Sequence, residues 1–356
     1  MALLRHSKII LLIAILVSNT GCQISYYLKS AYNQMDLLAS RVPIEKALKD
    51  PALTDEQRRK LLLAEAAKEF AKTTLQLSGG KNYGTFVKLD RPYVSYVVSA
   101  APKHKLEHHL WHYPFVGAMP YKGYFKEADA KEEEEYLKKQ NLDTYMRGVS
   151  AYSTLGWFKD PILSSMLRYS DYDLVNTIIH ELTHATLYIK HEADFNEQLA
   201  TFAGDQGADL FYLQKEGADS PTLKKIRLEN EDNQLFSKFI SGETSELKKW
   251  YEANPKATEE QRAAQFELIK GNFEKKLKPQ LQSDAYANFP KTNLNNARLM
   301  LYRTYMQDLS AFKKLYELSG SDFIKFIEAA KTLEKAKDPE KGLRELIQKF
   351  ESEKKQ

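Results

Sequence analysis

The spacing of hydrophobic positions predicts helices in the first part of the chain. From Ser25 to about Arg41 apolar residues recur every three or four positions, which is the period of an amphipathic helix. A second helix is expected to begin after Thr54, because Gln57 stands three residues later and completes a capping box. This helix is expected to run toward the glycine pair at 79–80, where the pattern breaks.

The pattern then changes to short strands and returns to helices. The segments from Tyr93 to Ala100, from Trp111 to Phe125 and from Tyr145 to Leu155 are rich in Val, Tyr, Phe and Trp and predict strands. A strongly charged helix is expected at about Glu127 to Gln140, and nearly everything beyond Asp171 has helical spacing. Strands in the middle with helices on both sides predict an α+β fold, with a central, mainly antiparallel sheet flanked by N- and C-terminal helices.

Composition narrows the class of protein. The 356 residues are 43% hydrophobic and 28% charged, as in soluble globular proteins, and the net charge is only +4. A balance this close to zero does not predict binding to nucleic acid. The chain contains one cysteine, Cys22, which excludes an intramolecular disulfide and a thiolate metal cluster. The sequence indicates no oligomeric state.

The first residues have the pattern of an export signal. Arg5 and Lys8 precede the apolar run from Ile9 to Val17, which is too short to span a bilayer. Small or polar residues follow up to Gly21, and Cys22 comes directly after them. This cysteine resembles the lipidated cysteine of a bacterial lipoprotein, although Asn19 stands where leucine is usual. The alternative is an ordinary cleaved signal beside an incidental cysteine.

We therefore predict a signal peptide over residues 1–21 and one domain over residues 22–356. Within that domain, residues 22–80 are expected to be helical and residues 81–170 to be rich in strands. Residues 171–216 are expected to form the helices of the candidate site, and residues 217–356 to form the helical C-terminal part. Lipidation of Cys22 would make the protein membrane-anchored rather than membrane-spanning.

The chemistry is expected in the HExxH segment from His180 to His184. Histidines four residues apart lie one turn apart on the same face of a helix, so both can reach a single Zn²⁺ ion. Glu181, beside the first histidine, is placed to take a proton from a zinc-activated water. Because the surrounding turns are apolar, a lone carboxylate there requires a reason, and a metal site supplies one.

A catalytic zinc needs a third protein ligand, and Glu197 is the best candidate. The metzincin arrangement fails, because Lys190 stands six residues after the second histidine, and His191 is too far along a continuous helix. Glu197 begins a second apolar-faced segment and would complete a His₂Glu set, as in thermolysin-like peptidases. Glu192 and Asp194 are alternatives in the intervening connection. Asp205 is a candidate acceptor for the second ring nitrogen of a ligand histidine, or else a solvated charge.

These segments resemble a bacterial family of predicted aminopeptidases, gluzincin-like envelope proteins that are often lipoproteins. The resemblance is carried by residues 179–190 and 193–202, and also by the shorter segments 91–94, 123–125, 151–157, 160–161 and 295–298. It implies a zincin-like fold, His180, His184 and Glu197 as zinc ligands, and Glu181 as general base. It also implies an aminopeptidase acting on peptide substrates.

Further site residues are weaker candidates. A peptide could add to a sheet edge beside the site helix, for which residues 148–156 are the candidate. Candidate donors to the oxyanion and candidate substrate contacts are Tyr152, Arg298, Tyr302 and Tyr305. A histidine cluster, formed by His104, His108, His109 and His112, is expected to be an exposed loop rather than a metal site.

The sequence therefore predicts a lipid-anchored zinc metallopeptidase of the cell envelope. The rival hypotheses are an endopeptidase with the same site and a non-catalytic binding protein that retains the fold. Gln23, rather than Asp, follows Cys22, which favours the outer membrane for the anchor.

Overall fold

The computed structural model describes residues 24–78, 82–113, 117–151, 159–305 and 309–354 of the chain. Within that part, an N-terminal helix over residues 24–39 is followed by β1 (Val42–Pro43), α2 (Ile44–Ala47) and α3 (Asp55–Thr73). The strand-rich part contains β2 (Thr85–Val87), β3 (Ser95–Pro102), β4 (Trp111–Tyr113), β5 (Gly117–Met119), β6 (Lys122–Tyr124), α4 (Glu127–Lys139), β7 (Leu142–Val149) and β8 (Ile162–Leu163).

The remaining described chain is helical. A 3₁₀ turn (Met166–Arg168) leads into α5 (Asp171–Thr186), α6 (Ala193–Glu216), α7 (Pro221–Ala253), α8 (Glu259–Asn272), α9 (Asn296–Tyr305), α10 (Ser310–Leu318), α11 (Phe323–Lys331) and α12 (Pro339–Glu353). Short π and 3₁₀ turns (Phe273–Leu277, Lys278–Gln280, Phe289–Lys291 and Thr332–Lys335) join these helices. In the described part of the chain, none of the helices is both long and apolar enough to cross a bilayer.

The predicted α+β class is confirmed, but the strands do not form one central sheet. Among the described residues they form three small sheets with the orders β1-β2-β8, β6-β3-β7 and β4-β5. All pairings are antiparallel except β2 with β8. The capping box of Thr54 and Gln57 is present, and α3 ends at Thr73, before the predicted glycine pair.

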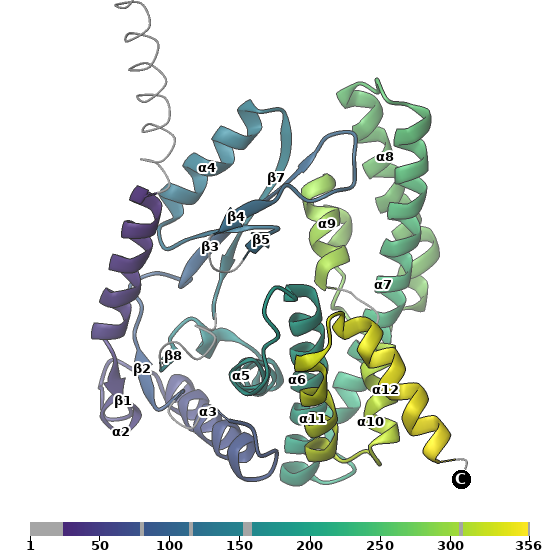
Figure 1. Ribbon diagram of the computed structural model, residues 1–356. Coiled ribbons are helices and arrows are strands. Elements are labelled where there is room, and N and C mark those ends of the chain that lie inside the picture. Colours follow the sequence, from purple (N-terminus) through teal and green to yellow (C-terminus); the bar gives the residue numbers. More distant parts are fainter. Residues whose placement is uncertain (1–23, 79–81, 114–116, 152–158, 306–308, 355–356) are drawn as a thin grey trace, which may run out of the picture.

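Strand β3 contributes side chains to two hydrophobic clusters. Its residues Tyr96, Val98 and Ala100 face α4 and form a small core with Ala130 and Leu137. Ala101 belongs instead to a larger cluster with α7, α8 and α9, because successive side chains of a strand point to opposite faces. Figure 1 shows this sheet above the helices α3, α5, α6, α10, α11 and α12, which surround the principal core.

A buried ion pair joins α8 to the sheet. The guanidinium of Arg262, with 2% of its side chain exposed, donates to the carboxylate of Asp143 on β7. The same carboxylate accepts a 2.9 Å bond from the backbone amide of Asn296, at the start of α9. One acidic side chain therefore fixes both helices against β7.

Replacing Asp143 with alanine should destabilise the protein strongly. The substitution leaves the buried Arg262 cation without this carboxylate, so we expect the free energy of unfolding to fall by about 3–5 kcal/mol in a urea titration. Glu259, which also pairs with Arg262 at 2.7 Å but is 58% exposed, provides the control. Glu259→Gln should change the free energy by less than about 1 kcal/mol. Equal losses in the two variants would contradict this account of the ion pair.

Candidate metal centre

Helix α5 carries the HExxH segment. Its N-terminus is capped by Ser170, whose hydroxyl accepts a 3.0 Å bond from the amide of Asp173. Asp171 and Asp173 in the first turn match the positive end of the helix dipole. The helix lies between α3 and α6 (Figure 1), and Ile178, Ile179 and Leu182 are buried among its neighbours. Its apolar sides therefore fix its rotation.

Asn196 fixes the connection between α5 and α6. Helix α5 ends at Thr186, and Leu187 has extended backbone angles. The buried Asn196 side chain accepts a 2.8 Å bond from the amide of Ile189 and donates a 2.6 Å bond to the carbonyl of the same residue. Both polar backbone groups of the connection are thus satisfied at the first turn of α6, and the next residue is Glu197.

Two glycines let α6 approach α5 closely. A Cβ added to Gly204 would lie 2.9 Å from the Asn176 Oδ1 atom and 3.2 Å from the Cβ of His180. At Gly207 it would lie 2.7 Å from a methyl group of Ile179. Contacts this short require the neighbour to move, so these two positions have no room for a side chain.

The close approach brings His180, His184 and Glu197 together, and we call these residues the triad. The Nε2 atoms of the two histidines are 3.2 Å apart. The two oxygens of Glu197 each lie 3.6 Å from one of those nitrogens, Oε2 from His180 and Oε1 from His184. In the described part of the chain, the triad is the group of three or more His, Cys, Asp or Glu side chains that could hold a metal ion.

The separations fit tetrahedral coordination. Ligand atoms at about 2.0–2.1 Å from a zinc ion lie about 3.3–3.4 Å from one another in an ideal tetrahedron. The 3.2 Å separation of the two histidine nitrogens is close to that edge length. The two 3.6 Å distances join different oxygens of Glu197 to different histidines, and with one ligand atom per residue the triad atoms lie within 4.8 Å of one another. Two imidazole nitrogens and one carboxylate are also a donor set that zinc prefers. The donor set and its spacing therefore fit a metal ion held by these three side chains.

The triad is accessible from one side. The side chain of His184 is 4% exposed and that of His180 19%, whereas 40% of the Glu197 side chain is exposed. Glu197 is therefore the member of the triad that is most accessible to solvent.

Electrostatics favours a neutral imidazole at His184. Burial, together with the neighbouring His180, lowers the pKa of His184 to about 4. At neutral pH its ring is therefore uncharged, and the tautomer protonated at Nδ1 offers the Nε2 lone pair to a metal. Burial opposes the charged forms of His180 and Glu197, but their mutual attraction outweighs it, so the pKa of His180 is raised and that of Glu197 lowered.

Several charged and aromatic groups surround the triad. The positive charge of Arg147, on the edge strand β7, also contributes to the lowered pKa of Glu197. The ring of Tyr188 lies 6.1 Å from that of His184. Burial and the charge of Glu181 together raise the pKa of Tyr169. The sequence analysis missed Arg147, Tyr169 and Tyr188 as site residues, since nothing in their local pattern distinguishes them.

Asp205 forms part of the layer behind the triad. It accepts a 2.7 Å bond from the Nδ2 atom of Asn176, and burial raises its pKa to about 6. The charge of Asp205 also raises the pKa of His180, and the charge of His180 lowers the pKa of Asp205. The prediction that Asp205 accepts from a ligand histidine stays a prediction; Asp205 is half-buried and hydrogen-bonded to Asn176.

The candidate oxyanion donors Arg298 and Tyr302 have aromatic side chains as neighbours. Arg298 lies 4.8 Å from the ring of Tyr145 and 3.4 Å from the hydroxyl of Tyr302, whose ring packs against Phe236 and Phe289 in the cluster around α7 to α9. Cys22, Tyr152 and the side chain of Tyr305 lie outside the described residues.

The predicted strand and histidine loop are partly described. Strand β7 ends at Val149, so only the start of the candidate edge at 148–156 belongs to it. In the histidine cluster, the Nε2 atom of His104 lies 3.0 Å from the carbonyl of Ala257, and His109 packs edge-on against Trp111. These contacts direct the two rings to different neighbours.

The family comparison covers most of the chain. The model of a protein family described as Putative aminopeptidase matches residues 25–344, which include α5, α6 and the whole triad. No match was found among the curated proteins or among the solved structures.

The close packing of α6 on α5 can be tested with Gly204→Ala. The new methyl group would push against Asn176 and His180, so we expect metal affinity to fall about 10-fold or more, as when an outer-shell partner of a metal ligand is lost. Competition with a chromogenic chelator measures this affinity.

Gly242→Ala on α7 is the matched control, because a Cβ at Gly242 would have no atom within 4 Å. This variant should retain its metal affinity and gain up to about 1 kcal/mol of helix stability. Unchanged metal affinity in Gly204→Ala would show that the glycine contact does not position the triad.

Proposed function

The chain belongs to the protein family described as Putative aminopeptidase, and from this premise and the geometry of the triad we propose that it is a zinc-dependent peptidase. The observation that carries the proposal is the convergence of His180, His184 and Glu197, whose ligand atoms lie within 4.8 Å of one another, with Glu181 next to the first histidine. A binding protein that only retained the fold would have no use for a general base at that position.

The zinc ion would be held by the triad. Bound there, zinc supplies a Lewis acid for the substrate carbonyl and lowers the pKa of water toward neutrality. His184 contributes a neutral imidazole because burial holds its pKa at about 4. Glu197 remains ionised because its hydrogen bond with His180 lowers its pKa against the effect of burial.

Glu181 is the proposed general base. It takes a proton from the attacking water and delivers it to the nitrogen of the leaving amine. The phenols near the site can donate hydrogen bonds to the developing oxyanion. Burial, with the neighbouring carboxylates, raises the pKa of both Tyr169 and Tyr188, so their hydroxyls stay protonated at neutral pH. Arg147 adds a fixed positive charge on the same side as Glu197.

The substrate is proposed to be a peptide. Strand β7 is an edge of the β6-β3-β7 sheet, and it carries Arg147, whose charge acts on the triad. An extended peptide can pair with such an edge through its backbone, which would place a scissile bond beside the neighbouring site. The family name favours cleavage at a free N-terminus, and an endopeptidase with the same triad is the alternative.

We also propose that the protein is exported and anchored in the cell envelope through lipid on Cys22, facing the periplasm from the outer membrane. The support is the sequence of residues 5–23, with its charged start, apolar run, cysteine and following Gln23.

Replacing Glu181 by glutamine tests the proposed chemistry. We expect kcat for peptide hydrolysis to fall about 10²–10⁴-fold while the zinc content stays that of the wild type, because glutamine cannot accept the proton but leaves the triad intact. Glu192→Gln, in the connection between α5 and α6, is the control and should retain turnover.

Paired substrates separate the two peptidase hypotheses. An aminopeptidase should cleave a peptide anilide with a free N-terminus and leave its N-acetylated counterpart intact, whereas an endopeptidase should cleave internally quenched peptides regardless of acetylation. If the zinc-loaded wild type cleaves none of these substrates, the non-catalytic binding protein becomes the better account.

A further inference from the structure

The N-terminal helix over residues 24–39 contacts the body of the protein through one face. The hydroxyl of Tyr26 donates a 2.9 Å bond to the carbonyl of Gly123, and its ring packs edge-on against Tyr124 at 5.5 Å. Leu37 and Leu38 are buried at the end of the helix. These contacts hold the helix against β6 and the start of the principal core.

The opposite face is apolar and exposed. It consists of Ile24, Tyr27, Leu28, Tyr32 and Met35, which we call the apolar stripe; four of these side chains are between 57% and 72% exposed and Tyr27 is 37% exposed. At 3.6 residues per turn they occupy an arc of about 140° around the helix axis. Leu38 falls within the same arc but is buried, because it lies in the last turn, where the helix meets the principal core. The charged residues of the helix, Lys29 and Asp36, fall outside that arc.

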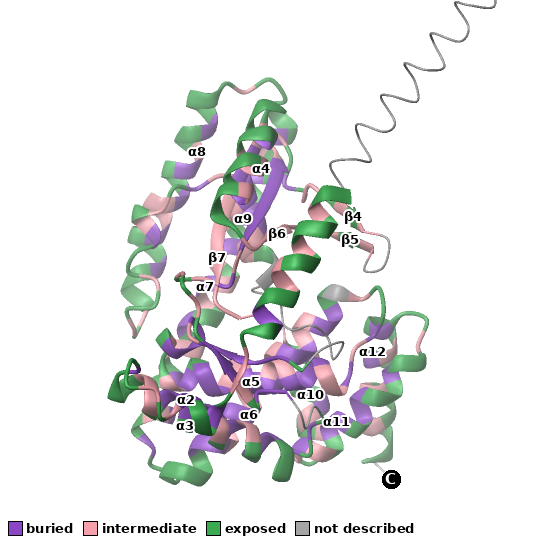
Figure 2. Ribbon diagram, turned by 90° about the vertical axis from the view of Figure 1, so that its left-hand side faces the viewer, coloured by how far each residue is buried: buried purple, intermediate pink, exposed green. Residues whose placement is uncertain are grey.

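The apolar stripe lies at the outer edge of the molecule. In Figure 1 the helix borders the left side, and Figure 2, which views that side, shows exposed residues along most of its length. Five large apolar side chains on one exposed helix face are more than the scattered surface hydrophobics of an ordinary protein.

We propose that the apolar stripe lies on the surface of the lipid bilayer, so that this helix is an interfacial membrane contact in addition to the anchor. The inference rests on the proposed lipidation of Cys22. Cys22 lies two residues before the first described residue of the helix, and a chain of two residues spans at most about 7 Å. Lipid attached at Cys22 would therefore bring the first turn of the helix to the membrane surface.

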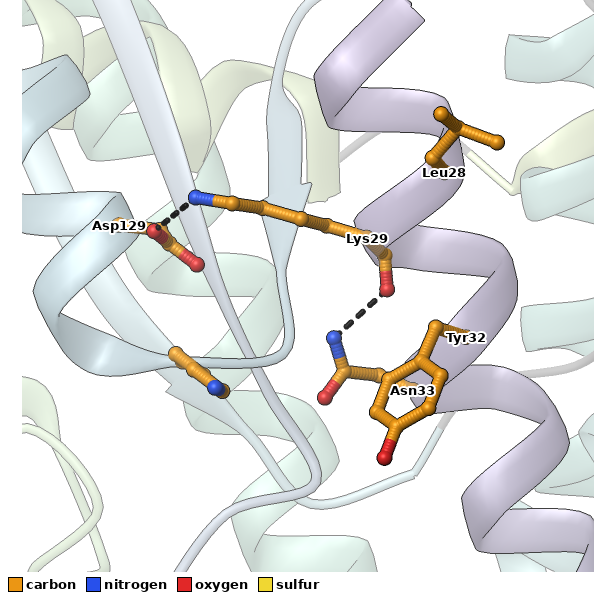
Figure 3. Close-up of a pocket in the computed structure, with 6 residues that line it drawn as sticks. Leu28, Lys29, Tyr32, Asn33 and Asp129 are labelled. Atoms are coloured by element: carbon orange, nitrogen blue, oxygen red, sulfur yellow. Dashed lines mark hydrogen bonds and ion pairs between the residues drawn. The ribbon is translucent and has the colours of Figure 1, made fainter.

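The side chains suit that location. Tyrosine is enriched at the boundary between headgroups and acyl chains, and Ile, Leu and Met can enter the acyl region. A shallow hollow of about 280 Å³ borders the apolar stripe at Leu28 and Tyr32 (Figure 3). Its other lining residues are polar, Lys29, Asn33, Lys126 and Asp129, and Lys29 pairs with Asp129 at 2.9 Å. Apolar groups thus adjoin polar groups that can remain at headgroup level.

This contact would orient the whole body. A lipid on a flexible terminus permits any orientation, whereas a helix held both by the bilayer and by Tyr26 fixes which side of the protein faces the membrane.

Depth-sensitive labelling of the full chain tests the proposal. Because Cys22 is the sole cysteine and lipidation consumes its thiol, one introduced cysteine can be labelled selectively with bimane. Two adjacent pairs provide matched positions, Leu28→Cys with Lys29→Cys and Met35→Cys with Asp36→Cys. In each pair both residues are exposed and only the first belongs to the apolar stripe. The labelled proteins are reconstituted into phosphatidylcholine vesicles that contain a nitroxide-labelled phospholipid.

We expect the labels at 28 and 35 to lose most of their emission to the lipid nitroxide, and those at 29 and 36 to be quenched mainly by aqueous iodide. Equal iodide quenching at all four positions would overturn the proposal. Protection of 28 and 35 from both quenchers would also overturn it, because a protein would then cover the apolar stripe.

Mass spectrometry of the same preparations separates failure of the anchor from failure of the helix contact. If Cys22 carries no lipid and the chain does not associate with vesicles, the anchor and the helix contact are both refuted. The zinc and hydrolysis tests of the triad are unaffected by that outcome.

Discussion

The close approach of α5 and α6 is the constraint on which the site depends. Helix α5 alone supplies two histidines one turn apart, and a carboxylate must come from elsewhere to complete a three-ligand set. Gly204 and Gly207 bring α6 near enough, and Asn196 holds the turn before it by bonding both the amide and the carbonyl of Ile189. Glu197 follows Asn196 directly, so the clamp on the connection also sets the position of the ligand.

The electrostatic state of the triad follows from that packing. Burial alone would lower the pKa of both histidines and raise that of Glu197. Because His180 and Glu197 lie close together, the pKa of His180 is instead raised and that of Glu197 lowered. His184, the member with the least exposed side chain, stays neutral. Two imidazole nitrogens 3.2 Å apart need a proton or a cation between them, because their lone pairs repel. A divalent metal satisfies both nitrogens and neutralises the carboxylate at the same time.

Much of this site could be predicted from the sequence because it depends on helical spacing. An interval of four residues places His180 and His184 on one face whatever the rest of the fold does, and the apolar pattern around Glu197 indicates a second packed helix. Helices such as α4 and the capped α3 were equally predictable, since capping residues and periodicity are local signals.

The rest depends on contacts between distant segments. Arg147 influences Glu197 from a strand whose position is set by its pairing with β3, and no local pattern indicates that pairing. The division of the strands into three small sheets follows from their tertiary contacts, although each strand region was visible in the sequence. Arg298 and Tyr302 were plausible as donors because of their residue types, whereas the structure surrounds them with the aromatic cluster of α7 to α9.

The most direct test of the central claim is the zinc content of the full chain, measured by mass spectrometry on wild type, Glu197→Gln and Glu192→Gln prepared in parallel. Both substitutions remove one carboxylate from the α5–α6 region, but only Glu197 belongs to the triad. The account predicts one zinc per chain in the wild type and in Glu192→Gln, and a large loss in Glu197→Gln. Wild-type protein without stoichiometric zinc after reconstitution, or an equal zinc content in all three proteins, would contradict it.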